Sequence, residues 1–306
     1  MALRNYLATE IALDHADGLL SRRDALHKLG LLGLSTVAAS GLLASCSSEA
    51  ASPAAAPSAA PNAAASAAAA APTASPDYDV AAARARSEDV TFPGGTGTMS
   101  GAWAAADNPK GAVIVVHENR GLTDHIRAVA GRFAGDGYSA LAPDLLSRAG
   151  GTAGVPDATT ALGAISTADL VTDLRSTMTE LRTRANGAAL AAVGFCFGGG
   201  MVWQLLNSGP SDLKAAVPFY GPSPDDPTFA GATAAVLGVF AEQDARVNAG
   251  RDKLDQALTA AGLTHEFVTE PGADHAFFND TGARYNPTAA ADAYQRVLSW
   301  FGTHMA

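Results

Sequence analysis

The apolar run at residues 111–117, Gly-Ala-Val-Ile-Val-Val-His, constrains the fold of this chain more than any other segment. An unbroken apolar run rich in β-branched side chains is typical of a strand that is buried on both faces. Strands that alternate with helices predict one α/β domain, in which helices cover both faces of a mostly parallel sheet. Residues 90–105 would add an antiparallel edge. Further strands are predicted at 138–143, 190–194, 213–219, 234–240 and 264–269, and helices around 126–133, 170–181, 250–261 and 287–301.

The first 46 residues carry the pattern of an export signal. Arg22 and Arg23 precede an apolar run at residues 29–43, which is shorter than the roughly twenty residues of a membrane-spanning helix and suits a signal core. The arginine pair resembles a twin-arginine signal, and the run ends in Leu-Ala-Ser-Cys46, which resembles a bacterial lipobox. In proteins with that motif the chain is cut before the cysteine, whose thiol receives lipid. We therefore expect an extracytoplasmic protein, either secreted or attached to the membrane only through Cys46.

One feature of this region leaves an alternative open. Glu10, Asp14 and Asp17 precede the arginines, although the start of a signal is normally positively charged. The alternative is an amphipathic N-terminal helix with a chance arginine pair and an inert Cys46. Residues 47–76 are mostly Ala, Pro and Ser, without a large apolar side chain. They predict a disordered linker, because the segment cannot bury enough surface to offset its ordering entropy. The catalytic domain would then span residues 77–306.

Composition excludes several classes of protein. Thirty acidic against twenty basic residues give a net charge of −10, and no basic cluster lies outside the N-terminal region, so a nucleic-acid partner is not expected. Two cysteines cannot build a framework of several disulfides. The seven histidines form no H-E-x-x-H motif and the cysteines are not paired in sequence, so we predict neither a metal nor an organic cofactor.

Cys196 stands in Gly194-Phe-Cys-Phe-Gly198, directly after the strand predicted at 190–194. This is the nucleophile-elbow pattern G-x-S-x-G with cysteine in place of serine, in which the glycines let backbones pass at a tight strand-to-helix turn. The turn would place the thiol at a helix N-terminus, where backbone dipoles favour the thiolate. The alternative is an inert, buried cysteine beside a glycine-rich helix start, whereas the phosphate-loop motifs are not matched.

Two further strand ends carry the partners that a nucleophilic cysteine needs. Asp244 follows the strand predicted at 234–240, and His275 follows the strand predicted at 264–269. The order nucleophile, acid, histidine is that of the α/β-hydrolases. We expect Cys196 to carry the acyl group, His275 to move the proton, and Asp244 to fix the tautomer of His275 and steady its positive charge. Asp274 is less suitable, because a residue next to a histidine rarely faces its ring correctly.

With these residues in place, residues 80–303 resemble the dienelactone hydrolases. A cysteine in the elbow is unusual among α/β-hydrolases, which makes the resemblance specific. It implies an α/β-hydrolase fold and an activity on esters or lactones. The matching segments are 115–121 with its His-Glu-Asn-Arg sequence, 142–145 followed by Arg148, 194–199, and the segments around Asp244 and His275.

The resemblance also implies roles for residues around the cysteine. In that family the glutamate of the first segment, here Glu118, helps to deprotonate the cysteine when substrate binds. In that family two backbone N–H groups form the oxyanion hole. The matching residues here are Phe197, which follows the nucleophile, and Asn119, which follows the glutamate. Arg148 matches one of two arginines that hold a substrate carboxylate through their planar guanidinium groups. The second position holds Asn279, which departs from the family pattern.

These residues predict a hydrolase that cleaves an ester or lactone of the dienelactone (carboxymethylenebutenolide) type through an acyl-cysteine intermediate. Because Asn279 departs from the pattern, a broad carboxylesterase or thioesterase is the alternative within enzymes. Outside enzymes, the alternative is an envelope lipoprotein that binds a ligand on the same scaffold, which a broken triad would have favoured. We expect a small-molecule ester or lactone as the partner of the chain, and a monomer.

Overall fold

The computed structural model describes residues 3–49 and 77–306. Its centre is one eight-stranded sheet with the order β1-β2-β4-β3-β5-β6-β7-β8. The pairs β1–β2 and β2–β4 are antiparallel, and every other neighbouring pair is parallel. The predicted mostly parallel sheet with an antiparallel edge is therefore confirmed. The strands are β1 Glu88–Pro93, β2 Thr98–Ala104, β3 Gly111–Val116, β4 Tyr138–Pro143, β5 Leu190–Phe195, β6 Leu213–Phe219, β7 Ala235–Ala241 and β8 His265–Glu270.

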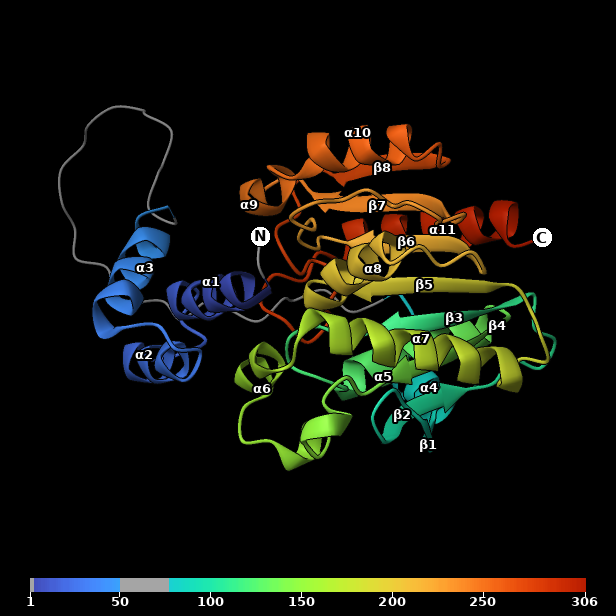
Figure 1. The fold of residues 1–306 in the computed structure, drawn as a ribbon, viewed down its shortest axis with the longest axis horizontal. Coiled ribbons are helices and arrows are strands. Elements are labelled where there is room, and N and C mark those ends of the chain that lie inside the picture. Colours follow the sequence, from blue (N-terminus) through green and yellow to red (C-terminus); the bar gives the residue numbers. More distant parts are fainter. Residues whose placement is uncertain (1–2, 50–76) are drawn as a thin grey trace.

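Helices cover both faces of this sheet, as the alternation of strands and helices predicts. On one face, turned toward the viewer in Figure 1, α7 (Thr167–Arg184) packs on β3 and β4, and α8 (Phe197–Asn207) packs on β5 and β6. On the other face, α5 (Asp124–Gly135) packs on β2, β3 and β4, and α11 (Pro287–His304) packs on β6 and β7. The strands β3, β4 and β5 between these layers are buried along their whole length, which explains why their sequences lack alternation.

Shorter elements occupy the connections. Most of them lie in the loops that follow the strands, and α4 precedes β1. The helix α10 lies beside β8 in Figure 1. These elements are α4 Val80–Ala85, η1 Ser147–Ala149, η2 Thr152–Gly154, α6 Ala158–Ala164, α9 Ala245–Asn248 and α10 Arg251–Ala260.

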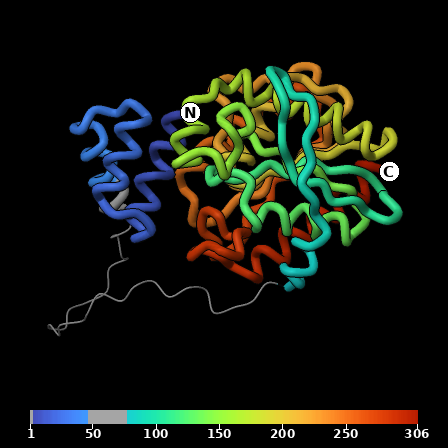
Figure 2. The backbone as a smooth tube through the Cα atoms, turned by 90° about the horizontal axis from the view of Figure 1, so that it is seen from below, coloured from blue at the N-terminus to red at the C-terminus, as the bar shows by residue number. Residues whose placement is uncertain are grey.

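Three helices at the N-terminus form a separate layer. The helices α1 (Leu3–Ala16), α2 (Arg22–Leu31) and α3 (Thr36–Glu49) pack on one another. They lie beyond the carboxyl ends of the parallel strands, and both views show them beside the body of the domain (Figures 1 and 2). Through α1 they also pack on α6. The N-terminal segment is thus packed against the catalytic domain, an arrangement that the sequence did not predict.

The structure divides the apolar run at residues 29–43 between two helices. Residues 32–35 separate α2 from α3, and within the run Leu29 and Leu43 are buried while Val37 is 84% exposed. In the two described ranges, no helix combines the length and the apolar character that crossing a membrane requires. Residues 47–49, predicted as the start of the linker, belong to α3. The rest of the predicted linker, residues 50–76, lies outside the described residues.

Candidate active site

Cys196 lies at a strained turn between β5 and α8. Its backbone has φ 55° and ψ −117°, a conformation that non-glycine residues adopt rarely and mostly at functional sites. A Cβ at Gly194 would lie 2.2 Å from the carbonyl oxygen of Gly198, and a Cβ at Gly198 would lie 2.3 Å from that of Val116. Both glycines of the elbow pattern are therefore required by close backbone approach, as the pattern predicts.

Asp244 and His275 come together from the ends of β7 and β8. The Nδ1 atom of His275 lies 2.5 Å from Oδ2 of Asp244. The other carboxylate oxygen of Asp244 accepts a hydrogen bond from the N–H of Val247 and so caps α9. Because parallel strands end at the same edge of the sheet, residues 196, 244 and 275 meet although they are far apart in sequence. All three side chains are at most 5% exposed.

Burial and neighbouring charges set the protonation of these groups in opposing directions. Burial alone would raise the pKa of Asp244, but the positive charge of His275 and a hydrogen bond from it hold that pKa below its usual value. Burial would lower the pKa of His275, but the carboxylates of Glu10 and Asp244 outweigh it and raise the pKa well above its usual value. The structure therefore favours an imidazolium between two carboxylates.

The thiol of Cys196 does not show the lowered pKa that its place at a helix N-terminus predicts. Burial raises the pKa of Cys196, and the nearby carboxylate of Glu10 raises it further, against the opposite effect of His275. The prediction of a favoured thiolate is thus wrong for the arrangement in the structure. The helix dipole is a modest effect, and burial of the thiol, together with the carboxylate of Glu10 at close range, exceeds it.

The loop after β3 brings Glu118 and Asn119 to the same pocket. Glu118 is 6% exposed and its carboxylate accepts a hydrogen bond from the side-chain amide of Asn279. Phe197 is the first residue of α8, so its N–H has no carbonyl partner within the helix. His117 has a different task. Its Nδ1–H donates to the carbonyl of Glu118 at 2.6 Å, and its Nε2 accepts the N–H of Leu145 at 3.1 Å, which ties the β3 and β4 loops together.

Arg148 does not reach this pocket. Its guanidinium donates to the carboxylates of Asp173, at 2.6 and 3.0 Å, and of Asp169, at 3.2 Å. It lines a different hollow, beside Gly94 and Ser147. The predicted contact of Arg148 with substrate is therefore not supported by its position. The two aspartates stand one turn apart at the start of α7, where they draw the guanidinium toward the helix.

The structure places two further side chains beside Cys196 that sequence reasoning missed. The hydroxyl of Tyr6 lies 3.1 Å from Sγ of Cys196, and a carboxylate oxygen of Glu10 lies 3.7 Å from the same sulfur. Both residues belong to α1. Glu10 also forms an ion pair with Arg246, which follows Asp244 in the β7 loop. The presence of acidic residues in an expected signal was the one sequence feature that pointed to another role for this helix.

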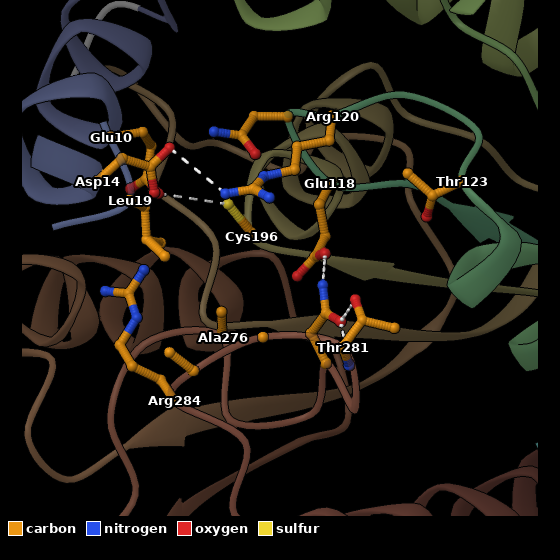
Figure 3. A pocket seen from close by; sticks show the side chains of 14 residues that line it. Glu10, Asp14, Leu19, Glu118, Arg120, Thr123, Cys196, Ala276, Thr281 and Arg284 are labelled. Atoms are coloured by element: carbon orange, nitrogen blue, oxygen red, sulfur yellow. Dashed lines mark hydrogen bonds and ion pairs between the residues drawn. The ribbon is translucent and has the colours of Figure 1, made fainter. Parts of the chain in front are cut away.

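A cavity of about 200 Å³ remains in front of Cys196. Besides Cys196 itself, its walls come from α1 and the turn after it, the loop after β3, and the loop after β8 (Figure 3). Arg284 lies at the side of this cavity that faces α1. The two arginines that line the cavity, Arg120 and Arg284, are therefore not the arginine that the family pattern predicts. The lining includes Glu10, Asp14, Leu19, Glu118, Arg120, Thr123, Cys196, Ala276, Thr281 and Arg284.

One set of metal-ligating residue types lies together in the described part of the chain. Glu10, Cys196 and His275 each offer an atom within 4.8 Å of the other two, and all three residue types bind zinc in other proteins. These are the groups of the cysteine site itself. Glu10 is already paired with the cation of Arg246, which opposes a second positive charge at this point.

A parallel sheet with a nucleophile elbow, and an acid and a histidine at the next strand ends, defines an α/β-hydrolase. The match to a family model is more specific. Residues 99–305 match the model of the dienelactone hydrolase family, which is more than half of the chain. The chain belongs to the dienelactone hydrolase family, and it is a hydrolase of that type.

Relatives and solved structures agree with this membership. A Synechocystis protein provisionally named carboxymethylenebutenolidase is 34% identical over an alignment of 215 residues, and the match covers 63% of this chain and 86% of that protein. A Saccharolobus solfataricus protein of the same provisional name is 32% identical over an alignment of 235 residues, and the match covers 64% of this chain and 91% of that protein. A Klebsiella pneumoniae crystal structure, provisionally titled a dienelactone hydrolase, has a TM-score of 0.64 at 32% identity and covers 71% of this chain and 98% of its own.

Proposed function

We propose that this protein cleaves an ester or lactone through an acyl-cysteine intermediate, with Cys196 as nucleophile, His275 as general base and acid, and Asp244 as the residue that orients His275. The observation that carries the proposal is the 2.5 Å contact between Asp244 and Nδ1 of His275. With Nδ1 bound to Asp244, Nε2 is the ring nitrogen on the side of Cys196. The hydroxyl of Tyr6 shows that Nε2 and Sγ are close together, since it lies 3.5 Å from Nε2 and 3.1 Å from Sγ.

The chemical steps follow from this geometry. With His275 in its neutral form, Nε2 takes the thiol proton while Sγ bonds to the carbonyl carbon, and the negative charge that forms on the carbonyl oxygen meets the N–H groups of Phe197 and Asn119. The carbon–oxygen bond to the leaving alkoxide then breaks, and His275 returns the proton to that oxygen. Water, deprotonated by His275, attacks the thioester and releases the acid and free Cys196. With a lactone, the alcohol stays part of the same product.

Glu118 fits a helper role in the first step. Its carboxylate lies in the same cavity as Cys196 and its charge acts on the thiol. The hydrogen bond from Asn279 holds the carboxylate in place. In the family pattern a glutamate at this position helps to deprotonate the cysteine when substrate binds, and we assign that role to Glu118.

A broader specificity is the second candidate, and the position of Arg148 favours it. Since Arg148 is bound to two aspartates and Asn279 replaces the second arginine, neither residue of the family pattern offers a free cation to a substrate carboxylate. Neutral aryl esters or thioesters are therefore reasonable substrates beside lactones. Comparing the kcat/KM of a neutral ester with that of its carboxylate-bearing analogue separates the two candidates.

We also propose that residues 1–46 direct export and that Cys46 is the site of lipid attachment. The support is the order of the arginine pair, the apolar run and the Leu-Ala-Ser-Cys46 sequence. Measuring the mass of the mature N-terminus in the native host tests this proposal. A chain that begins with a lipid-bearing Cys46 supports it, and an intact chain with unmodified Cys46 refutes it.

The nucleophile is tested by replacing each cysteine in turn. In the full chain before any cleavage, Cys196→Ala should abolish turnover of an aryl ester, while Cys46→Ala, the matched change at the other cysteine, should leave turnover unchanged. Mass spectrometry of the Cys46→Ala protein, quenched with acid during turnover, should find the acyl group on residue 196. Retained turnover in Cys196→Ala at equal expression would show that the mechanism is wrong.

A further inference from the structure

The helix α1 places two side chains directly against the reacting atoms. The Tyr6 hydroxyl lies 3.1 Å from Sγ of Cys196 and 3.5 Å from Nε2 of His275. One turn further along the helix, Glu10 lies 3.7 Å from the same sulfur and 3.5 Å from the same nitrogen. A reacting carbonyl carbon must come within roughly 3–3.5 Å of the nucleophile. Tyr6 and Glu10 therefore occupy the space that the substrate would need.

The helix is held there by apolar packing. Tyr6, Leu7 and Ile11 are at most 1% exposed, and α1 packs on α6 of the catalytic domain. The ring of Tyr6 also lies under the guanidinium of Arg246, 4.6 Å from it. Part of this burial is against α2 and α3, which also pack on α1. The part that is buried against the catalytic domain, at roughly 1.5–3 kcal/mol for each large side chain buried completely, favours a docked helix over one that only passes near the site.

Charge complementarity adds to this packing. Glu10 and Asp14 lie one turn apart on the helix, and Asp17 stands in the turn directly after it. Each meets an arginine of the catalytic domain: Glu10 pairs with Arg246, Asp14 lies 3.7 Å from Arg120, and Asp17 lies 3.4 Å from Arg284. Arg120 and Arg284 line the cavity in front of Cys196. The three acidic residues that did not suit a signal sequence are thus the three that contact the catalytic domain.

The contacts of Glu10 also oppose the chemistry. Its carboxylate competes with the substrate for the Nε2 side of His275, and its negative charge disfavours the thiolate of Cys196. A docked α1 therefore blocks the site in two ways, by volume and by charge. Both effects end when the helix leaves.

We propose that α1 is an intramolecular inhibitor of this hydrolase, so that docking of α1 and binding of substrate at Cys196 exclude each other. The claim about turnover rests on the function proposed above, whereas the claim that α1 covers the thiol does not. Because the helix belongs to the same chain, its effective concentration at the site is on the order of millimolar, and strong binding is not required. If the chain is cut before Cys46, the inhibitor is removed with the signal, and the enzyme is idle until it is exported.

Thiol labelling in the full chain tests the proposal without relying on turnover. In a Cys46→Ala background Cys196 is the only thiol, since the chain has two cysteines, and iodoacetamide reports its access. The double variant Tyr6→Ala/Glu10→Lys removes the contacts with Cys196 and places a cation against Arg246. We expect its alkylation rate and its kcat/KM for an aryl ester to rise at least about tenfold. Asn5→Lys, on the exposed side of α1, is the matched control and should change neither.

A conservative variant guards against misfolding of the double variant. Glu10→Gln keeps the size of the side chain and loses the ion pair with Arg246, so alkylation should rise by a smaller factor, about two- to fivefold. If both variants are alkylated at the rate of the Cys46→Ala reference, α1 does not cover the thiol and the inference is wrong. If alkylation rises while no ester is hydrolysed, coverage of Cys196 by α1 stands and the proposed function fails.

Discussion

The hydroxyl of Tyr6 lies 3.1 Å from Sγ of Cys196, although 190 positions separate the two residues in the chain. The contact joins the N-terminal helix layer to the nucleophile of an α/β-hydrolase. It also changes the electrostatics of the site, because Glu10 follows Tyr6 by one turn and acts on both Cys196 and His275. The chemistry of this hydrolase therefore has to be tested with the N-terminal segment present.

Replacement of Asp244 tests the orientation of His275. In Asp244→Asn the amide cannot balance an imidazolium and favours the wrong tautomer, so kcat should fall on the order of 10³- to 10⁴-fold. The asparagine oxygen can still accept the N–H of Val247, so the cap of α9 and the fold should persist. The measurement is kcat for an aryl ester, with circular dichroism as the check on folding.

Asp274→Asn is the control for that substitution. Asp274 is next to His275 but accepts only its backbone N–H, at 2.6 Å, and an asparagine oxygen can do the same. Its kcat should stay within about twofold of the reference. If kcat falls as far in Asp274→Asn as in Asp244→Asn, the assignment of the orienting role to Asp244 is wrong.

Arg148→Ala should affect stability more than catalysis. The substitution leaves the carboxylate of Asp173, whose side chain is 1% exposed, with little more than the N–H of Gly95. An unpaired buried carboxylate predicts a loss of about 2 kcal/mol in the free energy of unfolding, measured by urea titration. Arg182→Ala breaks a pair whose side chains are 47% and 42% exposed, and it should cost less than about 1 kcal/mol. A rise in KM for anionic esters, without a loss of stability, would restore the substrate-binding role.

Glu118→Gln separates an effect on the resting thiol from an effect on turnover. The charge of Glu118 raises the pKa of the Cys196 thiol, after the larger effects of burial and Glu10. Its removal should therefore move the pH dependence of iodoacetamide alkylation toward lower pH. Turnover should nevertheless fall, by about 10²-fold, if the carboxylate helps to deprotonate the cysteine when substrate binds. Glu266→Gln, on an exposed position of β8, should change neither; parallel changes in alkylation and turnover would contradict the helper role.

Most of the domain could be predicted from sequence because its signals are local. The strand predicted at 213–219 is β6 with the same bounds, and the others agree within one or two residues. Glycine spacing identified the turn at Cys196, and strand ends identified Asp244 and His275, since a parallel sheet brings those ends together. The resemblance to a family located Glu118, which the structure places in the cavity.

The N-terminal layer could not be predicted in the same way. Docking of α1 depends on pairs such as Glu10 with Arg246, which are 236 positions apart, and no local pattern encodes such a pair. The spacing of Glu10, Asp14 and Asp17 is visible in the sequence, but not the arginines that they meet. The predicted contact of Arg148 with substrate is not supported for a related reason. The family pattern gives the position of Arg148 in the chain, whereas Asp169 and Asp173 determine where its side chain lies.

Glu270, at the end of β8, predicts a pH dependence of stability that is separate from catalysis. Its side chain is 2% exposed, and burial together with the charge of Asp292 raises its pKa to about 7. The nitrogen of Arg296 is 4.0 Å away, too far for a hydrogen bond. In the unfolded chain the pKa returns to about 4.3. Between these two values the folded state binds more protons than the unfolded state, so this residue makes stability fall as pH rises from about 4 to about 7.

Glu270→Gln should therefore stabilise the protein at about pH 8, where the native carboxylate is charged, and change little at about pH 5, where the folded carboxyl is protonated. After allowance for screening by solvent, we expect a gain of about 1 kcal/mol at the higher pH. Urea titration at both pH values measures it, with Glu266→Gln as the exposed control on the same strand. An equal gain at both pH values would mean that the charge of Glu270 is not its cause, because only a titrating carboxylate makes the gain depend on pH.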